Sequence, residues 1–285
     1  MSVRKNLAAA GIAACAGLTC LPATHAHAQA SPGGQGGGAT MPSGAAPAQQ
    51  AGTFGMLKGK IDFWSYYQEN ADGTNTFKET ARMQQPFQLP DNWRMTLRAD
   101  LPLMYTDKQG PANRTRDWEW GWGDPLAQVS FSTPKITENI SLGFGARIVV
   151  PVGDDSPYGG SQWKWAPQFS LSYDAKDITP GLTFDPMVRY IKGFSPTRGG
   201  ITTTREYDFY PTATYKFGDG WAVSLWNENP IILNDRTDKW FVPLDGMIWK
   251  TLSPSWELGF GAATKLVDDD PNYKNMVYGR ITAFF

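Results

Sequence analysis

Apolar and polar side chains alternate along many short stretches of this chain, and no other feature restricts the fold as strongly. From Trp93 to Tyr105, every second residue is apolar, and most of the residues between them are polar or charged. The stretch from Ile140 to Val150 repeats this pattern. Side chains of a β-strand point alternately to its two faces, so each stretch predicts a strand with one apolar and one largely polar face.

Stretches of this kind recur to the end of the chain, about twelve in all, and each is long enough to cross a bilayer as a tilted strand. The predicted strands are 58–68, 77–89, 93–105, 124–132, 140–150, 163–174, 182–194, 206–217, 221–232, 240–250, 256–267 and 275–285. The alternation is least regular from Trp240 to Lys250. We predict an all-β fold, a transmembrane antiparallel up-and-down β-barrel, with a soluble β-sandwich as the alternative.

The connections between the predicted strands alternate between short and long ones. The short ones are 90–92, 133–139, 175–181, 218–220 and 251–255, and the longer ones are 69–76, 106–123, 153–162, 195–205, 234–239 and 268–274. Short periplasmic turns and longer outer loops are the rule for outer-membrane barrels. Trp93, Trp221 and Trp256 directly follow short turns, as expected for an aromatic girdle at one membrane interface; an aromatic core in a soluble β-fold is the alternative.

The chain ends in Phe285, which closes an amphipathic stretch that begins at Met276. Counting back from Phe285 in twos gives only apolar residues and glycine, whereas the other parity carries Arg280 and Thr282. A terminal aromatic residue on such a strand resembles the sorting signal that the barrel-assembly machinery of bacterial outer membranes reads. We therefore expect Phe285 to be an assembly signal.

The start of the chain has the pattern of a secretory signal peptide, which we place at 1–28. Arg4 and Lys5 precede an apolar run, and this run ends at the small-residue site Ala26-His27-Ala28. The alternative is a lipidated N-terminus at Cys15, because the residues up to Cys15 resemble a lipobox.

The next segment, 29–53, is rich in Gly, Ala and Pro and poor in bulky apolar side chains. Such a segment cannot bury enough surface to offset the entropy of ordering, so it predicts a disordered periplasmic tether. The barrel is then expected to occupy 54–285.

Both cysteines and both histidines of the chain lie within the predicted signal peptide, at Cys15, Cys20, His25 and His27. A mature chain without these residue types cannot form a disulfide, a zinc site with Cys or His ligands, or a catalytic site that depends on a thiol or a histidine. We expect no catalytic residue, metal, cofactor or nucleic-acid partner. Catalysis by carboxylates or by a Ser–Lys pair is the remaining enzymatic alternative.

Several short motifs resemble those of the outer-membrane barrel proteins named after the MetA pathway of phenol degradation. Gly121–Gln128 is similar to the way this family passes from a long loop into a strand. Leu142–Ala146, Val150–Asp154 and Trp256–Gly261 are similar to its strand and turn patterns. The resemblance covers most of 54–285 and implies an outer-membrane location and the passage of small, often aromatic, compounds.

If the apolar parity faces lipid, the other parity points into the lumen. The candidate lumen and solute-contacting residues are Arg98, Asp100, Gln128, Arg147, Gln168, Arg189, Tyr210, Trp226 and Glu228. We compared how many residues separate each candidate from the predicted start of its strand. The comparison predicts that Arg98, Arg147 and Arg189 share one inward layer facing Asp100 and Glu228. Two interpretations stay open: an ion-pair network that fills the interior, or a constriction or shelf that binds a small polar or aromatic solute.

Two loop segments carry weaker signals. The acidic segment Asp268–Asn272 could bind calcium, but the full spacing of a calcium loop is absent, so we expect solvated acids. The segment Arg114–Trp120 could contact lipopolysaccharide phosphates through its arginines, or form a solvated loop with aromatic residues at the rim.

Together these patterns predict a bacterial outer-membrane protein, exported by its signal peptide, that allows passage or uptake of a small, hydrophobic or aromatic solute. The alternative is a non-transporting barrel with a plugged lumen that serves as a surface structure or binds a partner. The expected partners are outer-membrane lipid and lipopolysaccharide, the barrel-assembly machinery and the solute itself.

Overall fold

The computed structural model describes residues 55–151, 157–160, 162–196, 203–269 and 272–285. The predicted signal peptide, the predicted tether and the alternative lipidation site at Cys15 lie outside these residues. So does part of the acidic segment Asp268–Asn272. In the described part of the chain, no helix is long and apolar enough to cross a bilayer, and no group of acidic, Cys or His side chains could hold a metal ion.

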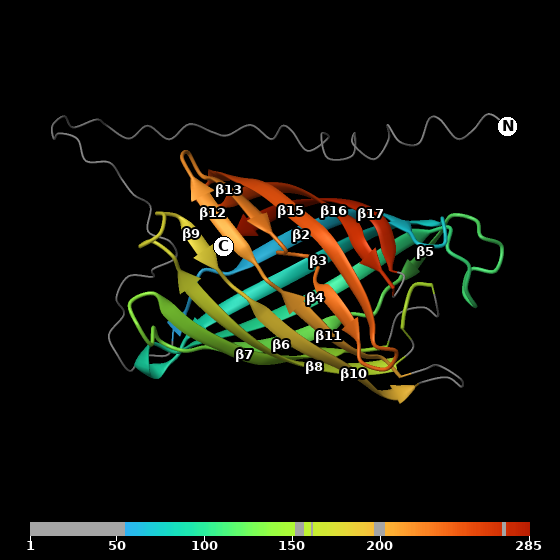
Figure 1. Ribbon diagram of the computed structural model, residues 1–285, viewed down its shortest axis with the longest axis horizontal. Coiled ribbons are helices and arrows are strands. Elements are labelled where there is room, and N and C mark those ends of the chain that lie inside the picture. Colours follow the sequence, from blue (N-terminus) through green and yellow to red (C-terminus); the bar gives the residue numbers. More distant parts are fainter. Residues whose placement is uncertain (1–54, 152–156, 161, 197–202, 270–271) are drawn as a thin grey trace. The chain divides into compact units, whose positions relative to one another are not determined.

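The strands belong to one antiparallel sheet that closes on itself (Figure 1). The strands are β1 (Gly55–Met56), β2 (Lys60–Asn70), β3 (Asn75–Gln88), β4 (Arg94–Thr106), β5 (Glu119–Trp122), β6 (Leu126–Ser132), β7 (Ile140–Val149), β8 (Gln162–Asp174), β9 (Leu182–Phe184), β10 (Met187–Pro196), β11 (Arg205–Tyr210), β12 (Ala213–Phe217), β13 (Trp221–Leu225), β14 (Ile231–Asn234), β15 (Lys239–Ser253), β16 (Trp256–Asp268) and β17 (Tyr273–Phe284). A short 3-10 helix, η1 (Pro90–Asn92), joins β3 to β4. The sheet closes because β17 pairs with β2.

Several transmembrane strands of the barrel are each divided into two shorter strands that continue one another. β5 and β6 both pair with β4, β9 and β10 both pair with β8, and β13 and β14 both pair with β15. β11 and β12 pair with β10 and β9 in the same way. When strands that continue one another are counted as one, the barrel has 12 antiparallel strands, which confirms the predicted fold class.

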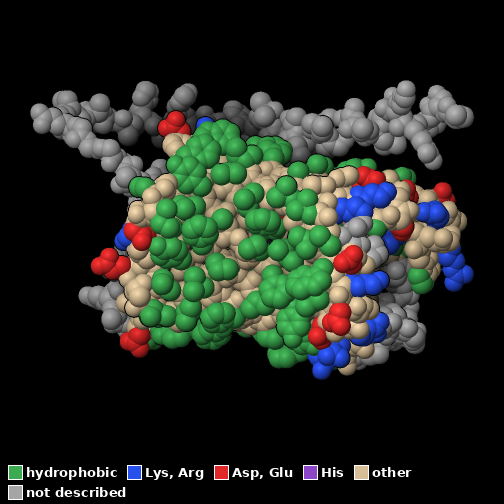
Figure 2. All heavy atoms as spheres, viewed as in Figure 1, with side chains coloured by type: hydrophobic (Ala, Val, Ile, Leu, Met, Phe, Trp, Pro, Cys, Tyr) green, Lys and Arg blue, Asp and Glu red, His purple; other side chains and the backbone are tan. Residues whose placement is uncertain are grey.

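The predicted alternation of faces is confirmed along the walls. On β4, Leu97 and Leu101 are exposed on the outside, whereas Arg98 and Asp100 line an internal cavity. Hydrophobic side chains cover much of the wall seen in Figure 2, and charged side chains gather mainly at one end. An apolar exterior around a polar interior is the reverse of a soluble fold and suits a barrel surrounded by lipid.

The two ends of the barrel differ. The turn end carries the start of β2, the end of β17 and η1, and the loop end carries the segment 107–118 between β4 and β5 (Figure 1). At the turn end, the backbone of Phe285 exchanges two hydrogen bonds of 3.0 Å with Gly59. A Cβ on Gly59 would lie 2.6 Å from Gln85 Oε1 and 2.7 Å from the ring of Phe285, so a larger residue there requires these side chains to move.

Two of the connections predicted to be long are tight turns. The connection predicted at 69–76 is closed by a 2.8 Å hydrogen bond from Asn70 N to Thr74 O. The side chain of Asp72 accepts a further hydrogen bond of 3.0 Å from Thr74 N. The connection predicted at 234–239 is closed by a similar backbone bond. The predicted alternation of loop lengths is wrong at these two places, because Asn and Asp side chains stabilise a turn without lengthening it.

Three neighbouring strands of the barrel are interrupted where we predicted continuous strands. The breaks lie at Pro186 between β9 and β10, at Pro211 between β11 and β12, and at Pro230 just before β14. Proline has no N–H to donate to the ladder, so each of these residues ends the regular pairing. In contrast, the least regular prediction, Trp240–Lys250, lies within the 15-residue strand β15.

Candidate functional site

A short segment between β13 and β14, residues 226–230, leaves the wall of the barrel, and we call it the inward loop. It begins at Trp226, whose φ of 49° lies in the left-handed region. Trp226 Nε1 donates a 2.8 Å hydrogen bond to Pro243 O on β15, and Thr212 Oγ1 donates one of 2.8 Å to Trp226 O. The prediction that Trp226 and Glu228 belong to a strand is therefore wrong, because the chain leaves the ladder ahead of Pro230.

The inward loop is held by one buried carboxylate, that of Asp245 on β15, which is fully buried. Asp245 Oδ2 accepts hydrogen bonds from the backbone N–H groups of Glu228 and Asn229, at 3.2 and 3.3 Å. Asp245 Oδ1 accepts from Asn229 Nδ2 at 2.8 Å and from the hydroxyl of Tyr278 at 2.7 Å. A buried charge is tolerated only with such compensation, so Asp245 fixes the position of the loop.

The Glu228 carboxylate joins the inward loop to β2 and β3. Its Oε1 accepts a 2.6 Å hydrogen bond from the hydroxyl of Tyr66 and one of 3.1 Å from Arg82 Nη2. Its Oε2 accepts from Arg82 Nη1 at 3.3 Å, which completes a two-pronged contact. Arg82 Nε also donates to Asp100 Oδ2 at 3.1 Å, and Arg98 Nε donates to Asp100 Oδ1 at 2.7 Å. A continuous chain of charges therefore connects Glu228 to β4.

We call Glu228, Arg82, Asp100 and Arg98 the charged layer, and two further arginines continue it around the inner face of the barrel. Arg147 Nη2 on β7 donates a 3.0 Å hydrogen bond to Gln128 Oε1, and the register places Gln128 opposite both Arg98 and Arg147. Arg189 on β10 is buried; its Nη1 lies 3.4 Å from Asp208 Oδ2, its salt-bridge partner. The other hydrogen bonds from Arg189 go to the side chains of Gln168 and Tyr210.

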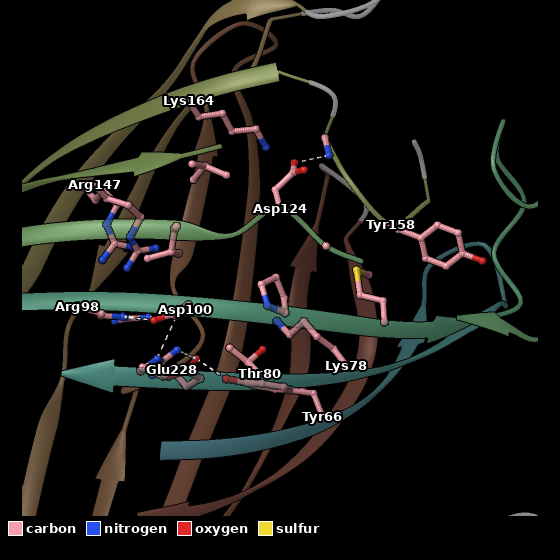
Figure 3. Close-up of a pocket in the computed structure, with 18 of the residues that line it drawn as sticks. Tyr66, Lys78, Thr80, Arg98, Asp100, Asp124, Arg147, Tyr158, Lys164 and Glu228 are labelled. Carbon is pink, nitrogen blue, oxygen red and sulfur yellow. Dashed lines mark hydrogen bonds and ion pairs between the residues drawn. The ribbon is translucent and has the colours of Figure 1, made fainter. Parts of the chain in front are cut away.

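A cavity of about 420 Å³ lies on the loop-end side of this layer (Figure 3). Tyr158, Asp124 and Lys164 lie towards the loop end, and Arg98 and Glu228 lie at the floor. Six cationic side chains line the cavity: Lys78, Arg82, Arg98, Arg147, Lys164 and Arg189. Three carboxylates line it: Asp100, Asp124 and Glu228.

The structure brings most of the predicted lumen residues together. The predicted residues that line the cavity are Arg98, Asp100, Arg147, Arg189, Tyr210 and Glu228. Gln128 and Gln168 stand beside the arginines and accept their hydrogen bonds. Trp226 instead anchors the inward loop to β15. The predicted layer exists, but Glu228 contacts Arg82 and Tyr66 rather than any of the three predicted arginines.

Sequence reasoning missed the other lining residues of the cavity, and four of these matter most to its chemistry: Tyr66, Lys78, Arg82 and Lys164. All four fall within predicted strands, and Lys78 and Arg82 share one parity with Thr80. This shared parity could have identified Lys78 and Arg82, because alternate residues of β3 starting at Lys78 face the lumen.

The lumen is filled on one side. A cluster of buried side chains from β2, β15, β16 and β17 occupies that side, and it includes Trp64, Tyr66, Phe241, Met247, Tyr273 and Tyr278. Trp64 and Tyr66 stack with 5.7 Å between ring centroids. The opposite side, below Arg147, presents short side chains, because Ser130 pairs with Gly145 and Ser170 pairs with Gly143. The aromatic cluster therefore occupies the lumen beside β15, β16 and β17, none of which contributes a residue to the lining of the cavity.

Neither a protein-family model nor a curated protein matches the chain in sequence. Among solved structures, it is similar to the COG4313 outer membrane channel from Pseudomonas putida F1, with a TM-score of 0.62 and 14% identity over 86% of this chain and 100% of that chain. It is also similar to the NanC porin, with a TM-score of 0.51 and 12% identity over 79% of this chain and 99% of that one. The P. putida toluene transporter TodX, with a TM-score of 0.41 and 10% identity over 80% and 87% of the two chains, overlaps too loosely to carry an argument. The first two likenesses show the fold, that of an outer-membrane β-barrel.

Proposed function

We propose that this protein is an outer-membrane channel for a small, hydrophobic or aromatic solute. The observation that carries this proposal is a cavity of about 420 Å³ inside a wall whose outer face is apolar. This volume lies in the range of sites for small molecules. The two similar barrels are named as a channel and a porin, which supports the same function here.

Passage depends on the bridge between Glu228 and the wall. A solute that enters at the loop end reaches a floor formed by Arg82, Asp100 and Glu228. Glu228 belongs to the inward loop rather than to a wall strand, so its side chain can turn away without breaking the sheet. We infer that Glu228 narrows the passage and that release of Arg82 and Tyr66 widens it.

Flux into lipid vesicles tests the proposal. Purified barrel in vesicles should carry benzenesulfonamide, a neutral aromatic solute, faster than protein-free vesicles do, and faster than it carries an aliphatic polyol of similar size. Glu228→Gln removes the charge that holds Arg82 and should raise this flux several-fold while the barrel still folds. Solute flux in wild-type and Glu228→Gln vesicles that is no faster than in protein-free ones would overturn the channel proposal.

A second candidate is a non-transporting barrel that serves as a surface structure or binds a partner. The bridge from Glu228 to Arg82 and the aromatic cluster around Trp64 favour it, because both place protein atoms across the lumen. In that case the charged layer only fills space. Glu228→Ala and Arg147→Ala should then lower stability without any solute-specific effect on flux.

The location and the partners belong to the same proposal. The fold and the apolar outer face support an outer-membrane location with lipid around the wall, and exposed Trp118 and Trp120 near Arg114 suit contact with lipopolysaccharide at the loop end. We further propose export by the signal peptide at 1–28 and recognition of Phe285 by the barrel-assembly machinery. Membership of the MetA-pathway family rests on the sequence motifs alone.

A further inference from the structure

We propose, on the basis of the channel function above, that the solute is a small aromatic anion, such as an aromatic carboxylate. Three cations of the cavity, Lys78, Arg147 and Lys164, form no salt bridge with any carboxylate in the described part of the chain. We call them the unmatched cations. Even when Asp208 behind Arg189 is counted, cations outnumber carboxylates around the cavity by six to four.

The unmatched cations differ in their partners from the three other cations of the cavity, which are all arginines. Arg82, Arg98 and Arg189 each contact a carboxylate, at 3.1, 2.7 and 3.4 Å. In contrast, Arg147 Nε and Nη2 donate to the neutral oxygen of Gln128. Lys78 Nζ lies 4.2 Å from the centre of the Tyr66 ring, which attracts a cation without neutralising it.

A need to fill the lumen does not explain why three cations of the cavity lack a carboxylate partner. A charge removed from water costs free energy unless it is paired, and an interior that needs only volume is served equally well by neutral side chains. All three unmatched cations line the cavity, and only Lys78 also contacts the aromatic cluster, through Tyr66. Their missing partner is therefore best supplied by an anion that enters the cavity and leaves it.

The positions of these cations suit movement along the lumen. Lys164 pairs with Val149 on β7, two residues closer to the loop end than Arg147. Lys78 pairs with Met104, closer to the loop end than Arg82, which pairs with Asp100. Two residues of a strand span about 7 Å. An anion can therefore pass from one cation to the next without meeting a single deep trap, as conduction requires.

The remaining lining explains why the anion should carry a ring. Tyr66, Tyr158 and Tyr210 offer aromatic surfaces, and Leu126 and Met187 offer aliphatic ones. Rings favour stacked or edge-on contact with other rings. A planar guanidinium such as that of Arg147 can hold a carboxylate or sulfonate through two hydrogen bonds. A ring joined to an anionic group therefore matches the lining better than either part alone.

The experiment compares two solutes of nearly equal shape, benzenesulfonate and its neutral analogue benzenesulfonamide. Their protein-dependent flux is measured in vesicles that contain the full barrel, together with the reversal potential across a planar bilayer in a KCl gradient. The test variant combines Lys78→Gln, Arg147→Gln and Lys164→Gln. The control variant is Lys135→Gln, which removes one charge from an exposed turn outside the lumen.

The wild type should carry the sulfonate faster than the sulfonamide and should be anion-selective. The triple variant should lower the ratio of sulfonate to sulfonamide flux by about tenfold, the low end of the effect of electrostatic focusing in a charged cleft. The control variant should leave this ratio unchanged. Arg147→Lys keeps the charge and should retain most of the ratio even if its packing differs.

Three results would overturn the proposal. The first is equal flux of sulfonate and sulfonamide in the wild type, which leaves the channel function intact. The second is a triple variant that folds but keeps the wild-type ratio. The third is selectivity for chloride with no sulfonate flux, which excludes an aromatic solute. Absence of flux for both aromatic solutes instead contradicts the channel function itself, so the two failures are distinguishable.

Discussion

An arginine on the outer face of β4 should destabilise the barrel far more than an arginine one position away on its inner face. Leu97 is 44% exposed on the outer face and pairs with Val129 of β6. It lies between Trp93 and Tyr105, the aromatic residues near the two ends of the strand. A strand tilted as in membrane barrels gains about 2.5 Å of depth per residue. Leu97 therefore lies about 5 Å from the middle of the apolar band.

An arginine at the bilayer midplane of a barrel costs about 2–4 kcal/mol, and this cost falls towards the interfaces. At the depth of Leu97, we expect Leu97→Arg to lower the free energy of unfolding by about 2–3 kcal/mol. Thr96→Arg should cost less than about 1 kcal/mol, because a lumen-facing charge is not placed in lipid. Its partner Ser130 is small and leaves room for the longer side chain.

Reversible urea unfolding in lipid vesicles, followed by tryptophan fluorescence, measures both losses. Heat-modifiable mobility on gels confirms that the same folded barrel is compared. Equal losses for Leu97→Arg and Thr96→Arg would refute the assignment of faces, and with it the orientation of every candidate lumen residue.

Three further changes test other parts of the structure. Deletion of Phe285 should lower the amount of folded barrel in the outer membrane while export across the inner membrane continues, as fractionation and gel mobility measure; an unchanged yield would show that Phe285 is only a terminal residue. Asp245→Ala should release the inward loop, because it leaves the donors around Asp245 unsatisfied; we expect a loss of about 1–3 kcal/mol of stability and a higher flux in the barrels that fold. Asp245→Asn, which keeps an accepting oxygen, should do less, and equal stability of Asp245→Ala and wild type would contradict the anchoring role. Arg82→Gln and Glu228→Gln should show a coupling free energy of about 1–3 kcal/mol in a double-mutant cycle, whereas additive losses would contradict the bridge across the lumen.

Local sequence patterns predicted the walls of this barrel well, because lipid and lumen impose opposite demands on the two faces of every strand. Leu97 and Arg98 are neighbours in sequence, and their alternation alone assigned them correctly to the outside and the inside. The same alternation brought Arg147 and Arg189 to the lumen. The interruption near Pro230 could have been expected as well, since a proline cannot donate to the ladder.

The contacts that shape the lumen were not predictable in the same way. Glu228 and Arg82 are 146 positions apart in sequence, and their contact depends on a loop that leaves the wall. The anchor of that loop, Asp245, lies on the strand whose alternation was the least regular. Periodicity reports which face a residue occupies, but it carries no information about which side chains meet across the lumen.

The most direct test of a channel through this lumen is a reversible block at Glu228. The chain has two cysteines, Cys15 and Cys20, both within the signal peptide that we propose at 1–28. In a barrel purified without residues 1–28, Glu228→Cys therefore supplies the single thiol. Labelling with a bulky methanethiosulfonate reagent should stop solute flux into vesicles, and reduction with dithiothreitol should restore it. Lys135→Cys on an exposed turn, labelled to the same extent, should retain full flux. Complete labelling at Glu228→Cys without a change in flux would contradict passage through this lumen.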